Sequence, residues 1–286
     1  MSERLAVAGQ HLLPKQALTS MAGAFARWQG GALTTSVIRW FIGRYGVNMA
    51  EAADADPAAY ASFNDFFTRA LKPGARPLVP ADLVSPVDGA ISQLGAIAGD
   101  QLLQAKGHSY STTALVGGDA ALAAHFHGGQ FATIYLSPRD YHRIHMPCAG
   151  RLLRMVHVPG ELFSVNPATA RGVPGLFARN ERVVCVFESE DGTPWVLVLV
   201  GATIVGSMAT VWHGLVNPPR TGRLREWAYQ DEDIRLSQGA EMGRFLLGST
   251  VVLLFPRRDG RQVAFNPAWA PGGAVRVGQV MGRLGP

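Results

Sequence analysis

The chain has 286 residues, of which 48% are hydrophobic and 16% are charged, so it can bury a sizeable core and is not an intrinsically disordered protein. Its net charge of +5 comes mostly from dispersed arginine. Without a dense basic block, this charge argues against a nucleic-acid-binding arm and suits an anionic membrane surface, phosphate groups or an ordinary surface. The two cysteines, Cys148 and Cys185, form no disulfide framework and favour a reducing cytoplasm.

The first segment after the N-terminus is expected to be helical, from Lys15 to Tyr45, with a break near Gly30-Gly31. Apolar residues recur there at the three-and-four spacing of one helix face, and arginines flank them: Leu18, Met21, Ala22, Phe25 and Trp28, with Arg27, Arg39 and Arg44. This pattern fits either a helix that lies on a membrane surface or a helical hairpin packed on its own domain. A further helix is expected from Asp56-Pro57 to about Leu71.

From Val84 onward the pattern changes to strands and turns. Apolar segments of strand length recur along this part of the chain: Ala90–Ile97, Phe131–Leu136, Leu152–Val158, Arg182–Phe187, Val196–Val200, Thr203–Val211, Val251–Phe255 and Ala274–Val277. Helical pieces are expected at Ser111–Leu115 and Ala120–Ala124, and a turn with one or two short strands after Pro256. We therefore predict an α+β, mainly β fold, with a helical region at residues 1–75 and a β-rich domain at residues 76–286.

The uncharged run from Trp195 to Trp212 is long enough to suggest a membrane span. Its residues are rich in β-branched side chains, and Gly201 and Gly206 interrupt it. We therefore expect two buried strands that meet near these glycines.

A glycine–serine pair, Gly248-Ser249, separates two apolar runs near the end of the chain. Glycine leaves its carbonyl open to close approach, and the next hydroxyl could attack that carbonyl if a base and an oxyanion site were present. By itself, the same pair is also typical of a simple bend between two strands.

A base for such a reaction is available in the loop Ser137–Pro147, which contains His142 and His145. The two histidines are three residues apart, so on a helical turn they would face the same way. Asp88 lies in the turn Ser85-Pro86-Val87-Asp88-Gly89, and a carboxylate can orient a histidine that activates a serine. Asp88, His145 and Ser249 are therefore candidates for orienter, base and nucleophile.

A second cluster, His125-x-His127, would place two imidazoles on one face of a strand. Such a pair can bind zinc, which makes a zinc-dependent hydrolase the alternative function. No HExxH or paired-cysteine motif accompanies this pair. In the main hypothesis, therefore, the protein uses no metal.

Several stretches together resemble one known family, the bacterial phosphatidylserine decarboxylase proenzymes of the pyruvoyl-dependent class. They are Phe63–Arg69 (FNDFFTR), Ser85–Gly89 (SPVDG), Tyr135–Pro147 (YLSPRDYHRIHMP), Gly160–Asn166 (GELFSVN), Phe177–Val183 (FARNERV), Val200–Ser207 (VGATIVGS) and Glu241–Thr250 (EMGRFLLGST). Any one of these stretches is weak evidence, but all of them in the family's order are specific.

The resemblance implies that the proenzyme cleaves itself between Gly248 and Ser249, giving a β chain of residues 1–248 and an α chain of residues 249–286. The family's self-cleavage triad falls on Asp88, His145 and Ser249, and Ser249 becomes a covalent pyruvoyl group. This group is the cofactor: it forms a Schiff base with phosphatidylserine, which loses CO2 and becomes phosphatidylethanolamine. We assign His142 to assisting decarboxylation or reprotonation.

The resemblance further implies a peripheral protein on the cytoplasmic side of the bacterial inner membrane. Its partners would be phosphatidylserine, the anionic membrane surface and its own two cleaved chains, as a heterodimer that dimerises again, with no nucleic acid. The stretch Ser85–Ile91 is similar to the strand-turn of lipoyl/biotinyl-type domains, so we expect a lipoyl/biotinyl-like β-sandwich, duplicated in one version of this hypothesis. The remaining alternatives are a non-catalytic binding module and a pyruvoyl decarboxylase that acts on another amino-acid head group.

Overall fold

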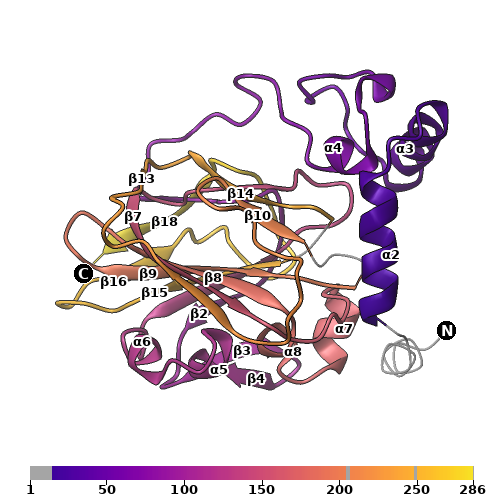
Figure 1. The fold of residues 1–286 in the computed structure, drawn as a ribbon. Coiled ribbons are helices and arrows are strands. Elements are labelled where there is room, and N and C mark those ends of the chain that lie inside the picture. The colour runs from indigo at the N-terminus through magenta and orange to yellow at the C-terminus, as the bar shows by residue number, and fades with distance from the viewer. Residues whose placement is uncertain (1–14, 204–206, 248–249, 286) are drawn as a thin grey trace.

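The computed structural model describes residues 15–203, 207–247 and 250–285. Within these residues the fold is mainly β with helices at the N-terminal end, which confirms the predicted fold class (Figure 1). The finer expectations, a lipoyl/biotinyl-like sandwich and a boundary at residues 75–76, stay predictions.

An antiparallel sheet of nine strands forms the centre of the described structure. Its order is β12–β7–β8–β9–β15–β5–β2–β17, with β13 also paired to β7. The bounds are β2 Gly89–Ala96, β5 Gln130–Tyr135, β7 Gly150–Val158, β8 Arg182–Glu188, β9 Pro194–Val200, β12 Arg225–Ala228, β13 Arg235–Leu236, β15 Thr250–Phe255 and β17 Ala274–Val275. Every residue of β15 is buried, as its continuous apolar run predicts for a strand covered on both faces.

Two smaller sheets cover one face of the central sheet (Figure 1). One has the order β11–β10–β14–β6, with bounds Gly214–Leu215, Met208–Thr210, Glu241–Phe245 and Arg143–His145. The other has the order β1–β18–β16, with bounds Leu83–Val84, Val280–Gly285 and Gln262–Phe265. Met208, Met242 and Met281 from these sheets share one core with Val251 and Leu253 of β15.

Short helices and a hairpin cover the opposite face (Figure 1). They are β3 Gln101–Ala105, β4 His108–Ser111, α5 Thr112–Leu115, α6 Ala120–Ala124, α7 Pro167–Gly172 and α8 Leu176–Arg179. Leu102, Leu115 and Leu176 pack there against Val252 and Leu254, the residues of β15 that alternate with those facing the other core. The predictions at residues 111–115 and 120–124 are confirmed.

The N-terminal helices form a separate small core. Their bounds are α2 Lys15–Arg27, α3 Ala32–Tyr45, η1 Pro57–Ala59 and α4 Phe63–Phe67. Phe41 of α3 packs edge-on against the aromatic rings of α4, and Leu247, the residue before the predicted cleavage site, packs against the same cluster. The predicted break between two helices near Gly30-Gly31 is confirmed.

Three sequence expectations need correction. The helix expected from Asp56 to Leu71 is two short pieces, because Tyr60 is extended and Ser62 starts α4 with a capping box to Asp65. The loop expected at residues 137–147 contains strand β6, and the tail after Pro256 holds three strands rather than one or two.

The run Trp195–Trp212 does contain two strands, β9 and β10. No helix among the described residues is long and apolar enough to cross a membrane.

Candidate active site

Asp88 lies in the turn between β1 and β2, where its carboxylate is held from two sides. The Arg76 guanidinium donates to both carboxylate oxygens, with Nε at 2.9 and 3.0 Å, and the backbone N–H of Val277 donates to Oδ1 at 2.9 Å. Arg76 also pairs with Glu51 at 2.8 Å, and this hydrogen bond lowers the pKa of the Glu51 carboxyl. Gly89 is required beside Asp88, because a Cβ there would come within 2.3 Å of the Tyr135 carbonyl oxygen.

The two candidate histidines lie at β6, and their arrangement differs from the prediction. A helical turn would have turned both side chains the same way, but Arg143–His145 is a strand paired with β14, so His142 and His145 do not share a helix face. The ring centre of His142 lies 4.1 Å from that of Phe67 in the N-terminal core, whereas the ring of His145 packs against Tyr141. The strand forms because β14 supplies hydrogen-bond partners that no local pattern reveals.

His145 is oriented by a backbone carbonyl. Its Nδ1–H donates to the Gly239 oxygen at 2.8 Å, which leaves Nε2 as the basic nitrogen. The Tyr141 hydroxyl donates to this Nε2 at 3.1 Å. Burial lowers the pKa of His145, so the imidazole is neutral near pH 7 and able to accept a proton.

His142 is completely buried and has a free basic nitrogen. Its Nδ1–H donates to the backbone carbonyl of Asp140 at 2.9 Å, and Nε2 has no partner in the described part of the chain. Burial lowers the pKa of His142 to about 3, with a smaller contribution from the positive charge of Arg69. The side chain is therefore neutral over the whole physiological range.

Asp88 and His145 are neighbours, but no hydrogen bond joins their side chains within the described residues. The His145 backbone N–H donates to the Pro86 carbonyl at 2.8 Å, which holds the Asp88 turn beside β6. The negative charge of Asp88 raises the pKa of His145 to a small extent, against the larger effect of burial. In this state the Gly239 carbonyl, rather than the Asp88 carboxylate, occupies the position of the orienting group.

The predicted cleavage site, Gly248-Ser249, lies outside the described residues. The described residue before it, Leu247, contacts the N-terminal core, and the one after it, Thr250, begins β15 in the middle of the central sheet. Thr250 pairs with Tyr135 on one side and Val200 on the other. Its hydroxyl oxygen is buried without a partner among the described residues.

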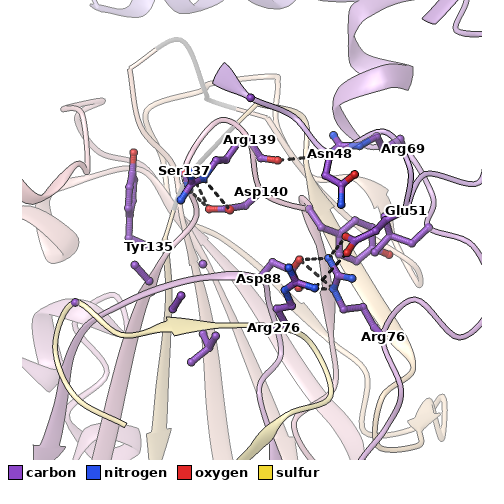
Figure 2. A pocket seen from close by; sticks show the side chains of 18 of the residues that line it. Asn48, Glu51, Arg69, Arg76, Asp88, Tyr135, Ser137, Arg139, Asp140 and Arg276 are labelled. Atoms are coloured by element: carbon purple, nitrogen blue, oxygen red, sulfur yellow. Dashed lines mark hydrogen bonds and ion pairs between the residues drawn. The ribbon is translucent and has the colours of Figure 1, made fainter. Parts of the chain in front are cut away.

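A cavity of about 510 Å³ lies next to this position (Figure 2). Tyr135, the strand partner of Thr250, lines it together with Asp88 and Tyr141. Charged side chains from three parts of the chain complete its wall: Glu51, Arg69 and Arg76 from the N-terminal region, Arg139 and Asp140 from the loop before β6, and Arg276 after β17. The cavity therefore extends from Tyr135, the strand partner of Thr250, to the region just after α3, to which the lining residues Gly46 and Asn48 belong.

The histidine pair considered for zinc lies elsewhere and has another geometry. His125 caps the end of α6 and His127 follows in a turn, so the expectation that they alternate along a strand is wrong. Both are exposed, and His127 is 4.0 Å from Asp100. No cluster of three metal-binding side chains occurs in the part of the chain that the structure describes.

Sequence reasoning missed the groups that contact the predicted residues. Arg76, which holds Asp88, lies in a proline-rich segment with no motif of its own, and the Gly239 carbonyl carries no sequence signal at all. Tyr141 and Arg69 were in the quoted motifs, where an aromatic hydroxyl or a cation next to candidate catalytic residues could have been noticed.

Comparisons with known proteins identify the family of this chain. The family model of phosphatidylserine decarboxylase matches residues 63–283, and a further model named PSD matches residues 5–46. Phosphatidylserine decarboxylase proenzymes of Delftia acidovorans and Variovorax paradoxus are 72% and 71% identical over 281 and 284 residues, covering 98% and 99% of both chains. That of Azoarcus sp. is 69% identical over 284 residues. The similarity thus includes the N-terminal helices and the tail, which lie outside the motifs quoted above. The chain belongs to the phosphatidylserine decarboxylase family.

Proposed function

We propose that this chain is a self-cleaving decarboxylase that converts phosphatidylserine to phosphatidylethanolamine and CO2 with a pyruvoyl group made from its own Ser249. The observation that carries this proposal is the match of the whole chain to relatives named as proenzymes of that activity. The position of the cavity supports it, because Tyr135 joins the cavity wall to the first residue of β15.

The described residues fit a pyruvoyl group at this point of the chain. Two buried polar atoms, the Thr250 hydroxyl oxygen and His142 Nε2, have no hydrogen-bond partner in the described structure. A pyruvoyl group or a bound substrate can supply the missing partners. The pyruvoyl carbonyl supplies the electron sink for the pair left behind when CO2 departs. His142 is neutral and keeps a lone pair at Nε2, so we assign it to holding or returning a proton during decarboxylation.

For self-cleavage we assign His145 as the base, Ser249 as the nucleophile and Asp88 as the charge that stabilises the protonated imidazole. His145 Nε2 takes the hydroxyl proton, and the Ser249 oxygen attacks the Gly248 carbonyl carbon, so the amide becomes an ester. Elimination removes the Cα proton of residue 249 and breaks the bond between its Cβ and the ester oxygen, so this oxygen leaves with the chain that ends in the Gly248 carboxylate. The resulting dehydroalanine tautomerises, and water replaces its nitrogen, which leaves as ammonia. Ser249 is required because its oxygen both attacks and departs.

Intact mass under denaturing conditions tests this assignment. The wild-type protein should give residues 1–248 and a second fragment from residue 249 with a pyruvoyl end, and cleaved protein should release CO2 from phosphatidylserine. Ser249→Ala should remain one chain, and Asp88→Asn and His145→Asn should cleave much more slowly. A wild-type chain that stays whole while folded, or a cleaved protein without decarboxylase activity, would refute the proposal.

We also propose that the protein binds the cytoplasmic surface of the bacterial inner membrane from one side, and that its two chains remain together and dimerise. The expected apolar face of α2 is exposed rather than packed on the domain: Met21 is 70% exposed, and Phe25 and Trp28 are also exposed. Trp40 of the neighbouring helix α3 is also exposed, at 63%. Arg27, Arg39 and Arg44 supply positive charge beside it, as an interfacial helix requires. The lipoyl/biotinyl-like description of the β body is likewise a proposal.

A further inference from the structure

One arginine at the cavity is buried without a counter-ion. Arg69 follows α4 and is only 4% exposed, yet no carboxylate lies within ion-pair distance of it among the described residues. Its Nη2 donates to the Arg139 backbone carbonyl at 3.3 Å, and its Nε is buried with no partner in the same residues. Such a group is unusual, because a buried charge normally has an opposite charge beside it.

The other arginines of the cavity differ from Arg69. Arg76 pairs with Asp88 and Glu51, and Arg276 pairs with Glu51 at 3.1 Å. Arg139 is 4.0 Å from Asp140, and 69% of its side chain is exposed to solvent. The carboxylates that line the cavity are therefore already engaged, which leaves the Arg69 charge available for an anion that enters from outside.

The chain holds Arg69 in place before any ligand arrives. Its guanidinium lies 5.3 Å from the ring centre of Phe66, a cation–π contact, and its backbone N–H donates to the Phe66 carbonyl at 3.1 Å. Arg143 donates to the carbonyl of the preceding Thr68 at 2.8 Å, which ties this corner to β6 (Figure 2 shows Arg69 beside the Arg139 loop). Burial lowers the pKa of Arg69, but a guanidinium stays charged at any physiological pH.

We infer that Arg69 binds the phosphodiester of the lipid head group and so positions the amino-acid end of the substrate toward the start of β15. This inference rests on the proposed function. A guanidinium matches the geometry of phosphate oxygens, and its unpartnered Nε–H supplies a donor. Arg69 and Tyr135 line the same cavity, so one head group can contact both regions.

The reaction itself favours the phosphodiester over the carboxylate as the ligand of Arg69. The carboxylate loses its charge as CO2 forms, so a cation beside it would stabilise the substrate more than the transition state and slow the reaction. The phosphodiester keeps its charge from substrate to product. A cation there binds both states equally and lowers KM without changing the chemical step.

The test compares Arg69→Met and Arg69→Lys with the wild-type enzyme, using only protein that intact mass shows to be cleaved. The measurements are kcat and KM for dioctanoylphosphatidylserine in detergent micelles, and the inhibition constant of dioctanoylphosphatidylethanolamine. The second lipid has the phosphodiester but no carboxylate. Arg235→Met, on β13, is the control for loss of one positive charge, because Arg235 is exposed and pairs with Asp233.

For Arg69→Met we expect KM and the inhibition constant to rise together by about 10- to 100-fold, as for loss of a charge-assisted hydrogen bond, with kcat near the wild-type value. For Arg69→Lys both constants should rise less, because lysine keeps the positive charge but lacks the planar guanidinium with its paired donors. A rise in KM without a rise in the inhibition constant would assign Arg69 to the carboxylate and overturn the inference. Unchanged constants, or a fall in kcat alone, would overturn it too. Cleaved wild-type protein without activity would instead refute the proposed function.

Discussion

The buried His142 should make the stability of this protein depend on pH in a way that one substitution removes. The folded state keeps the imidazole neutral with a pKa of about 3, whereas an unfolded chain has the ordinary value of about 6.5. Below pH 6.5 the unfolded chain therefore binds a proton that the folded chain does not. The stabilising contribution is present at higher pH and is lost as the pH falls from about 6.5 toward 3.

The size of this effect follows from the two pKa values. Between pH 7 and pH 5 the loss is about 2 kcal/mol from this group alone. His142→Asn keeps a donor for the Asp140 carbonyl but cannot titrate. This variant should lose about 2 kcal/mol less than its parent over that pH interval, although it is less stable than the parent at pH 7.

The assay is urea unfolding followed by tryptophan fluorescence at pH 7 and pH 5, in a Ser249→Ala background so that one uncleaved chain unfolds. His127→Asn is the control, because that side chain is half exposed. It should keep the pH dependence of the parent. If His142→Asn and the parent lose the same free energy of unfolding between the two pH values, the reasoning about the buried neutral imidazole is wrong.

Three further predictions follow from contacts in the structure. The Tyr141 hydroxyl donates to His145 Nε2 and so favours the neutral imidazole; Tyr141→Phe removes this donor, and the pKa of His145 should rise. The acid limb of the self-cleavage rate should then move to higher pH, as measured by mass on protein from cell-free synthesis at a series of pH values. An unmoved limb would contradict this. Arg76→Met leaves the buried Asp88 carboxylate without its guanidinium, while Glu51 keeps Arg276, and should lower the free energy of unfolding by about 3 kcal/mol in the uncleaved background; a loss near zero would mean that the Arg76–Asp88 pair contributes little. Trp40→Ser should weaken flotation with anionic liposomes, while Leu284→Ser, equally exposed on β18, should not; equal losses would refute the membrane-facing role of α3.

The sequence by itself determined which segments form the buried strands and the short helices that pack on them. Continuous apolar runs such as residues 196–200 and 251–255 predicted buried strands, and both lie at the centre of the main sheet. Local signals also placed the short helices at residues 111–115 and 120–124, where Ser111 and Asp119 cap the first turns. The motifs identified the family, since several specific stretches in one order rarely occur by chance.

Tertiary structure decided which groups meet at the site. The strand β6 exists because β14, about a hundred residues later, pairs with it, and this pairing separates His142 from His145. The Gly239 carbonyl reaches His145, and Arg76 reaches Asp88, through contacts that no local pattern encodes. The exposure of Met21 likewise depends on what packs against α2 rather than on its periodicity. Periodicity specifies which face of an element is apolar, but only packing between distant segments decides what that face, or a charged side chain, contacts.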